Sequence, residues 1–386
     1  MEFRLKKATD IIVFYYPVLY LFLALLSNDI ARKISLIMIL MLILNIVYSR
    51  NKSQVFLLLI VFGLIFYNAF VFGLNYVVHQ DFYGYVLILL ICINYSSKRN
   101  FLNFNSLFTY KNIMISISLF SVIVVVSILF GNGLQRSTEW GTSMPLLYGP
   151  YELPHSLSYQ LIAMFMYASI GYHKYNNFYF IIFMLSFSGM LVWTGVRSSF
   201  LVFAFVLLFE YFNIKKISIK SVIILSGLFV SLYLLLFTNF FQNNPIVQKT
   251  IKALSQTSGI TNGRTDFNNY LTNVYLNKLN IMEKVFGIGI EKLRHYMSLR
   301  YATALHAHND VFNTLLGMGL IGFMIYIFLL IKFCMLNTKW FKTFIPIFLL
   351  AFTNGLFMYT AFTPCLPVFL VYFQQLESKR AKIIYE

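Results

Sequence analysis

The chain has 386 residues, of which 59% are hydrophobic and only 11% are charged. Soluble domains carry about 25% charged residues, so the composition excludes an ordinary soluble protein and indicates a polytopic membrane protein. The net charge of +17 is explained by basic cytoplasmic loops and attraction to anionic lipid, and we expect no nucleic acid among the partners. The three cysteines have no CxxC spacing and predict neither a disulfide framework nor a zinc site.

Apolar runs along the chain predict an all-α membrane protein. A helix needs roughly 20 apolar residues to cross a bilayer, and runs close to that length predict about twelve transmembrane helices. The first has no small-residue cleavage site, so we interpret it as a retained span rather than a signal peptide. The predicted spans are 11–27, 34–49, 54–73, 81–96, 112–130, 156–172, 178–193, 198–213, 220–238, 311–333, 343–359 and 361–375.

Lysine and arginine in short loops predict the orientation. With the N-terminus inside, eighteen of the thirty basic residues fall on the cytoplasmic side, and the short outer loops hold only four. This asymmetry follows the positive-inside rule and places both termini in the cytoplasm. We therefore divide the chain into a transmembrane bundle with spans 1–9 (1–238), a large outer segment (239–310), and spans 10–12 with a cytoplasmic tail (311–386).

The first long outer loop, 131–155, is rich in aromatic and charged side chains. Aromatic faces stack on sugar rings and carboxylates accept hydroxyl protons, so these residues suit sugar binding. Aromatic anchoring at the membrane interface explains them equally well. The predicted substrate-binding residues of this loop are Arg136, Glu139, Trp140, Tyr151 and Glu152.

Arg197 interrupts apolar sequence in TGVRSSF. An arginine at the centre of a membrane helix costs roughly 3 kcal/mol on insertion scales, so it persists where it faces a polar cavity or an anion. The alternative is an arginine in a short loop whose side chain extends to the cytoplasmic surface. Because the predicted topology places Arg197 outside, we favour a functional role.

The outer segment 239–310 has helical patterning, with Phe267, Leu271 and Val274 on one face, and predicts a subdomain of short helices. Gly259 and Gly263 mark a turn in SGITNGRTDF, which places Arg264 near the N-terminus of the next helix. Guanidinium and free backbone N–H groups there would form an anion site. A solvated loop arginine is an equally good explanation of this sequence alone.

The sequence HAHND, residues 306–310, concentrates polar side chains just before an apolar run. His306 and His308 could bind a metal, but no H-E-x-x-H helix or carboxylate-rich partner accompanies them, and we predict no metal. Asn309 or Asp310 could cap the following helix. A histidine at the outer end of a span also suits general base catalysis near neutral pH. GMGLIG, 317–322, matches G-x-G-x-x-G but lacks a βαβ context, so we interpret its glycines as allowing close helix packing.

Together, Arg197 in TGVRSS, Arg264 in NGR, FGIGI, the histidine of HND and GMGLIG resemble the O-antigen polymerase and ligase superfamily over residues 190–325. The resemblance implies a membrane-embedded glycosyltransferase of the GT-C type that needs neither metal nor cofactor. Such enzymes use sugars linked to polyprenyl diphosphate, such as undecaprenyl diphosphate, and act on the outer face of the bacterial cytoplasmic membrane in lipopolysaccharide biosynthesis. The implied catalytic residues are His308, Arg197 and Arg264.

His306, Asn309 and Asp310 complete the predicted substrate-binding residues. We favour a polymerase that joins lipid-linked repeat units, with a chain-length regulator and a flippase as expected partners in the same membrane. A ligase that transfers finished polymer to a lipid A core is the first alternative. A lipid-linked oligosaccharide flippase is the second, but the spans before residue 130 are almost free of charge, which disfavours transport.

Overall fold

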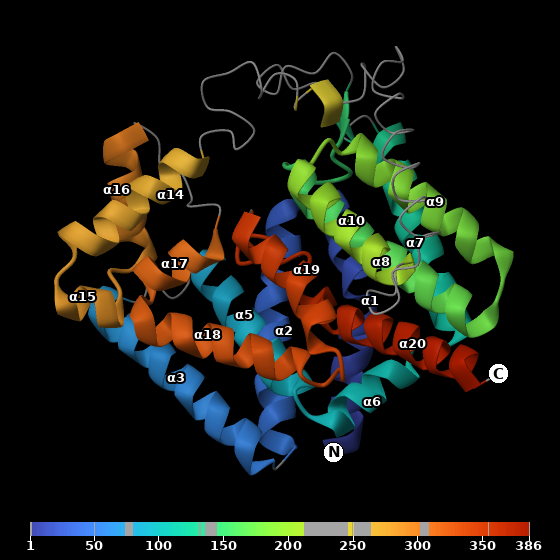
Figure 1. Cartoon of the computed structure of the whole chain (residues 1–386), viewed down its shortest axis with the longest axis horizontal. Helices are drawn as coiled ribbons and strands as arrows, with labels where there is room; N and C mark the ends of the chain where they lie inside the picture. The colour runs from blue at the N-terminus through green and yellow to red at the C-terminus, as the bar shows by residue number, and fades with distance from the viewer. Residues whose placement is uncertain are drawn as a thin grey trace.

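The structure is a computed structural model that describes residues 2–49, 51–73, 80–130, 133–135, 145–211, 246–248, 250, 264–301, 309–353 and 355–385. These residues are almost entirely helical (Figure 1). Ahead of the large outer segment lie α1 (Glu2–Leu26), α2 (Asn28–Tyr48), α3 (Lys52–Phe72), α5 (Gln80–Tyr95), α6 (Lys98–Ser106), α7 (Tyr110–Leu129), β1 (Leu134–Gln135), β2 (Leu146–Leu147), α8 (Pro154–Tyr175), α9 (Phe178–Trp193) and α10 (Arg197–Tyr211). After them come α14 (Arg264–Asn273), a π-helix (Val274–Lys278), α15 (Ile281–Phe286), α16 (Ile290–Tyr301), α17 (Asp310–Gly317), α18 (Gly319–Cys334), α19 (Trp340–Thr353), a 3₁₀ turn (Thr363–Cys365) and α20 (Leu366–Tyr385).

Four helices of the described part, α1, α2, α3 and α7, are long and apolar enough to cross a membrane, and four more are apolar but shorter. Large apolar side chains on the outside of the bundle are exposed, as in α3, where Phe66 and Phe70 are 74% and 84% exposed. A soluble protein would bury such residues, whereas lipid solvates them. These findings confirm a multi-pass membrane protein. The predicted span 220–238 lies outside the described residues, and about twelve spans and a GT-C fold stay predictions.

Three helices form the centre of the bundle. Residues 84–95 of α5, 157–171 of α8 and 366–373 of α20 are buried on every side. A helix that is buried all round must satisfy its polar groups within the protein. In α8 these groups include Ser158, Gln160 and Ser169, each with no exposed surface.

The predicted span 311–333 is two helices rather than one. α17 ends at Gly317 and α18 begins at Gly319, which has a φ of +70°. Only glycine adopts this conformation without strain, and a Cβ on Gly319 would clash with the Val285 carbonyl oxygen. Hydropathy could not predict this break between α17 and α18, because it carries no information on backbone dihedral angles.

The last two predicted spans, 343–359 and 361–375, also have different bounds. α19 ends at Thr353, and α20 begins only at Leu366. Between them, residues 355–362 contain no helix or strand, and we call them the connecting segment. This segment is mostly buried among the helices.

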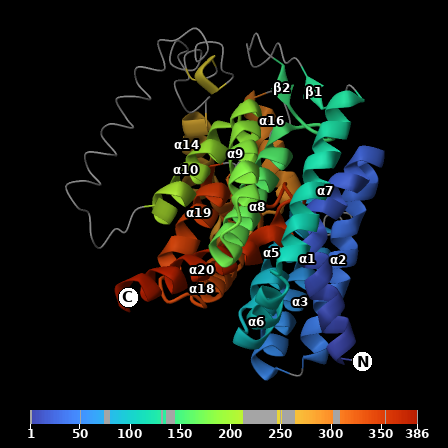
Figure 2. The same ribbon diagram turned by 90° about the vertical axis from the view of Figure 1, so that its right-hand side faces the viewer.

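The described part of the outer segment forms a small helical unit at the end of the molecule opposite the N-terminus (Figures 1 and 2). Leu271 and Val274 are completely buried there, and Phe267 packs against them, which confirms the predicted helical face. The same cluster includes Leu316 of α17. The FGIGI stretch lies against the break between α17 and α18, where the N–H of Ile288 donates to the Leu316 carbonyl (2.8 Å). The glycines of GMGLIG therefore allow the outer unit to dock closely on the bundle.

Candidate functional site

Asn309 and Asp310 fix the N-terminus of α17. The Asn309 side chain accepts a hydrogen bond from the Val311 N–H (2.9 Å) and caps the helix, as predicted. Asp310 is completely buried, and its Oδ2 accepts from the Leu356 N–H (2.6 Å) in the connecting segment. Gly355 has a φ of +82°, and a Cβ there would lie 2.7 Å from Asp310 Oδ1. Asp310 thus anchors the connecting segment, and its predicted contact with substrate stays a prediction.

The connecting segment also contacts the N-terminal turns of α8. The Tyr359 ring is stacked with His155 at a centroid distance of 5.8 Å and lies edge-on to Tyr159 at 5.0 Å. Gln160 donates through Nε2 to the Ala361 carbonyl (3.0 Å) and accepts from the Tyr151 hydroxyl (2.6 Å). The segment therefore joins the N-terminus of α17 to the N-terminus of α8.

Arg197 is the first residue of α10, after a short turn at 194–196, and is half-buried. Two residues later, Ser199 Oγ lies 2.7 Å from Ser158 Oγ in the first turns of α8. Both hydroxyls belong to completely buried residues. This hydrogen bond fixes the start of α10 against the start of α8, and with it the position of the Arg197 backbone.

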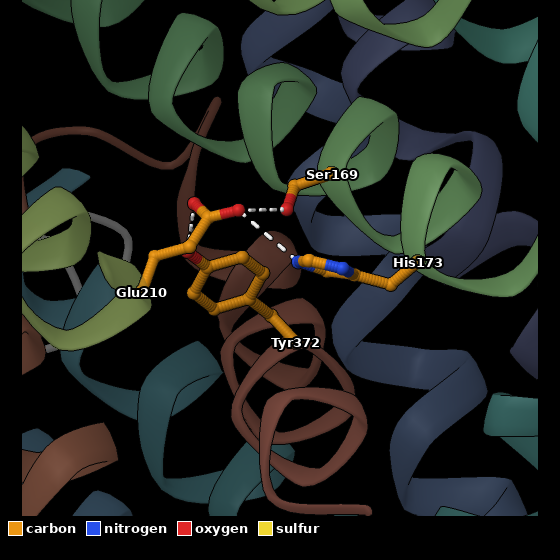
Figure 3. A network of polar contacts seen from close by, with 4 residues as sticks. All are labelled: Ser169, His173, Glu210 and Tyr372. Carbon is orange, nitrogen blue, oxygen red and sulfur yellow. Dashed lines mark hydrogen bonds and ion pairs between the residues drawn. The ribbon is translucent and has the colours of Figure 1, made fainter. Parts of the chain in front are cut away.

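A second polar contact holds the other ends of the same two helices (Figure 3). Glu210 Oε1 accepts from Ser169 Oγ (2.8 Å) and lies 3.1 Å from His173 Nε2, while Oε2 accepts from the Tyr372 hydroxyl of α20 (2.6 Å). Glu210 is 8% exposed. A buried carboxylate is costly unless it is hydrogen-bonded, and these partners from α8 and α20 supply the bonds.

The two contacts keep α8 and α10 in register. Ser158 pairs with Ser199 and Ser169 with Glu210, and both pairs are separated by 41 residues in sequence. The second pair lies eleven residues further along each helix, which is about three turns, or roughly 16 Å. Arg197 precedes Ser199 by two residues, as Ser156 precedes Ser158. The α8–α10 register therefore places Arg197 level with Ser156.

Ser156 borders a polar cavity of about 220 Å³ at the end of the bundle that is predicted to face outward, which we call the outer end. Tyr20 and Tyr151 line it, with ring centroids 6.1 Å apart. Arg32 and Glu152 form an ion pair of 3.0 Å at this cavity, and their side chains are 37% and 66% exposed. The cavity is also lined by Asn28, Leu153, Met358, Tyr359, Thr360 and Ala361.

A larger cavity of about 430 Å³ lies between the end of α3 and the outer helical unit. Its lining is mainly apolar, with Tyr67, Phe72 and Phe286 among the residues. At its border Lys292 donates to Glu283 (2.6 Å). This hydrogen bond holds the pKa of the Glu283 carboxyl below its usual value and raises the pKa of Lys292.

The predicted site residues fall into two groups. Tyr151, Glu152, Asn309 and Asp310 lie around the connecting segment, whereas Arg197 begins α10 and Arg264 begins α14. The others lie outside the described residues: Arg136, Glu139, Trp140, His306 and His308. Within the described ranges, no three His, Cys, Asp or Glu side chains are grouped as metal ligands.

Residues 181–327 match the model of the O-antigen ligase family. The match supports the resemblance to the O-antigen polymerase and ligase superfamily over this region. A search of curated proteins gave no significant match. The match supports a glycosyl-transferring function of the O-antigen polymerase or ligase type in general and does not distinguish the two.

The O-antigen ligase match begins within α9 and ends within α18. It includes Arg197, Arg264 and the HAHND stretch, and it also includes Ser199 and Glu210. It leaves out α8, the connecting segment and the cavity residues Tyr151 and Glu152. The outer end of the bundle thus combines residues of the matched region with residues from both ends of the chain.

The sequence interpretation did not identify Arg32, Ser199, Glu210 or the connecting segment. Glu210 had a visible signal, because an acid within the apolar stretch FLVFAFVLLFEYF is costly unless paired. Asn354-Gly355 and Pro364 are turn formers that indicated an interruption between the last two spans. Arg32 had no such signal, since a basic residue in a short loop is ordinary.

Proposed function

We propose that the protein is an O-antigen (surface polysaccharide) polymerase of the GT-C type. It would join oligosaccharide repeat units linked to polyprenyl diphosphate on the outer face of the bacterial cytoplasmic membrane. The observation that carries the proposal is Arg197 at the N-terminus of α10, within the family match and held in register with the N-terminus of α8. An arginine and a helix N-terminus together favour binding of a diphosphate.

In the proposed reaction a hydroxyl oxygen of the acceptor repeat unit attacks the anomeric carbon of the donor sugar. The new C–O glycosidic bond forms as the bond between that carbon and the diphosphate oxygen breaks, and its electron pair leaves with the diphosphate. His308 takes the hydroxyl proton. Arg197 and Arg264 bind the leaving diphosphate, whose charge grows in the transition state. Because the donor bond supplies the driving force, the reaction needs no nucleotide.

His306, Asn309 and Asp310 would hold the substrate beside His308. For Asn309 and Asp310 the described contacts are with the protein backbone, so we propose that they act by positioning the HAHND stretch. A chain-length regulator and a flippase are the proposed partners, because a polymerase needs its repeat units on the outer face and a limit to polymer length.

The test is an assay of the purified protein in lipid nanodiscs with lipid-linked repeat units as the only substrate. A ladder of lipid-linked polymers is the result expected of a polymerase. A parallel reaction also contains lipid A core and preformed lipid-linked polymer. Transfer to the core in that reaction, without a ladder in the first, would assign the protein as a ligase, and no product in either would contradict both.

The same assay tests whether a metal is needed. We expect excess chelator to leave product formation unchanged, because the arginines supply the positive charge at the leaving group. Activity that disappears with chelator and returns with one particular divalent metal would contradict this and assign His306 and His308 as ligands.

A further inference from the structure

The 220 Å³ cavity between α1, α2, α8 and the connecting segment has no part in the diphosphate chemistry described above. We propose that it is a subsite for one neutral sugar ring of the acceptor repeat unit. The inference rests on the proposed function, since it names the part of the substrate that the cavity would receive. Its support is the size, the charge and the position of the cavity.

Size limits the ligand to something small. Pockets for drug-sized ligands measure about 300–1,000 Å³, and this cavity is smaller, at about 220 Å³. With roughly 30 Å³ per water in the liquid, its volume corresponds to about seven waters. That is the size class of a single sugar ring with its hydroxyls.

The charge of the cavity disfavours an anion. Arg32 is paired with Glu152 at 3.0 Å and lies 3.5 Å from Asp29, so the nearby carboxylates offset its positive charge. A diphosphate would find no net positive charge here, in contrast to the sites proposed at Arg197 and Arg264. Hydroxyl groups, however, can donate to Glu152 and accept from Arg32.

The aromatic lining suits the apolar face of a sugar. Tyr20 and Tyr151 contribute two rings, and Tyr359 contributes a third from the connecting segment. All three tyrosines are 4–5% exposed. Neighbouring aromatic rings hold them in place, so they offer rigid surfaces and lose little entropy on binding.

The position of the cavity connects it to the transfer reaction. Ser156 lines it and lies level with Arg197 by the α8–α10 register. The donor's reacting sugar carries the diphosphate and so belongs beside the arginines. The cavity carries no net charge, because Arg32 and Glu152 in its lining are paired, so a sugar bound there is assigned to the acceptor.

The experiment measures two ligands on the same purified protein in nanodiscs. One is the free oligosaccharide repeat unit, released from its lipid by mild acid and titrated by saturation-transfer difference NMR. The other is geranyl diphosphate, titrated by calorimetry. The variants are Arg32→Gln and Glu152→Gln, and Lys33→Gln is the matched control, because Lys33 is the exposed neighbour of Arg32 and does not line the cavity.

We expect Arg32→Gln and Glu152→Gln each to weaken oligosaccharide binding about tenfold, or about 1.4 kcal/mol. Geranyl diphosphate binding should be unchanged, and Lys33→Gln should match the wild type for both ligands. Equal oligosaccharide affinity in wild type and both cavity variants, or no oligosaccharide binding by the wild type, would overturn the subsite. Failure of the wild type to bind geranyl diphosphate would instead count against the proposed function, while the oligosaccharide titrations would still decide the subsite.

Discussion

The two ends of the α8–α10 pair use polar side chains differently. At the inner end, the Glu210 carboxylate has Ser169, His173 and Tyr372 as partners, all from within the bundle. At the outer end, Ser158 and Ser199 bond to each other, and Ser156, two residues before Ser158, borders a polar cavity. A buried polar cluster whose members bond to one another holds helices together. Polar side chains that line a cavity, such as Arg32 and Glu152, can also bind a ligand. We therefore expect stability effects from the inner end and activity effects from the outer end.

The largest effect is expected at His308. If it is the general base, His308→Ala should lower turnover by about 10²–10⁴-fold and leave binding of the lipid-linked donor largely intact. His306→Ala should have a milder effect. Donor binding and product formation should be measured on the same preparation. Wild-type turnover would contradict the base assignment, and lost donor binding would make His308 a substrate contact.

Glu210→Ala tests the inner end. The substitution removes the acceptor shared by Ser169, His173 and Tyr372. Interhelical hydrogen bonds in membranes average about 0.6 kcal/mol each, so we expect a loss of about 2 kcal/mol in unfolding free energy. Glu210→Gln keeps an acceptor and should lose less. An unfolding temperature equal to that of the wild type in both variants would show that the network does not stabilise the bundle.

Ser199→Ala is expected to have an intermediate effect at the outer end. It removes one interhelical bond, worth about 0.6 kcal/mol, and that bond is the contact that fixes the start of α10, two residues from Arg197, against α8. Small displacements of a catalytic group lower the rate, so turnover should fall several-fold with only a slight change in stability. Ser158→Ala should lower turnover to the same extent, and turnover of the double variant should be no lower than that of either single variant. Additive losses would mean that the two hydroxyls act separately.

How much of this arrangement can be predicted from sequence differs from element to element. The apolar runs of α3 and α7, the cap at Asn309 and the buried face of α14 follow from local patterns, and the structure confirms them. The break at Gly319 and the connecting segment depend on a few dihedral angles within apolar sequence. The pairs Ser158–Ser199 and Ser169–Glu210 join residues 41 positions apart, and no local pattern encodes which helices become neighbours.

The candidate site shows the same limit. Arg197 could be predicted from sequence because an arginine in apolar sequence is costly. Tyr151 and Glu152 could be predicted because an aromatic ring and a carboxylate suit sugar binding. The placement of Tyr151 and Glu152 depends on the connecting segment, which sequence patterns assigned to two spans. The sugar-sized cavity could not be predicted, because Tyr20 and Arg32 near the start of the chain line it together with residues from 151–156 and 358–361.

The smallest effect is expected at the outer unit, where Lys292 holds the pKa of Glu283 below its usual value near 4.5. A lowered pKa in the folded state means that the ion pair stabilises this unit at neutral pH and is lost as the pH falls through the lowered value. Exposed ion pairs contribute about 0–1 kcal/mol. Hydrogen exchange of α15 should therefore be slightly faster in Glu283→Gln than in wild type at pH 7, and the difference should shrink as the pH falls through the lowered pKa of Glu283. A difference that stays constant as the pH falls until Glu283 is protonated would exclude the ion pair as its cause.

The most direct test compares Arg197→Ala with Glu210→Ala, purified side by side and measured for unfolding temperature and for polymer formed per folded molecule. We predict that Arg197→Ala unfolds at the wild-type temperature but loses polymer formation by about 10²-fold or more. Arg197→Lys should restore only part of it, because lysine lacks the planar fork that binds phosphate through two hydrogen bonds. Glu210→Ala should unfold at a lower temperature and keep most of its turnover. Polymer formation at the wild-type rate by Arg197→Ala would contradict the placement of the chemistry at the outer helix ends.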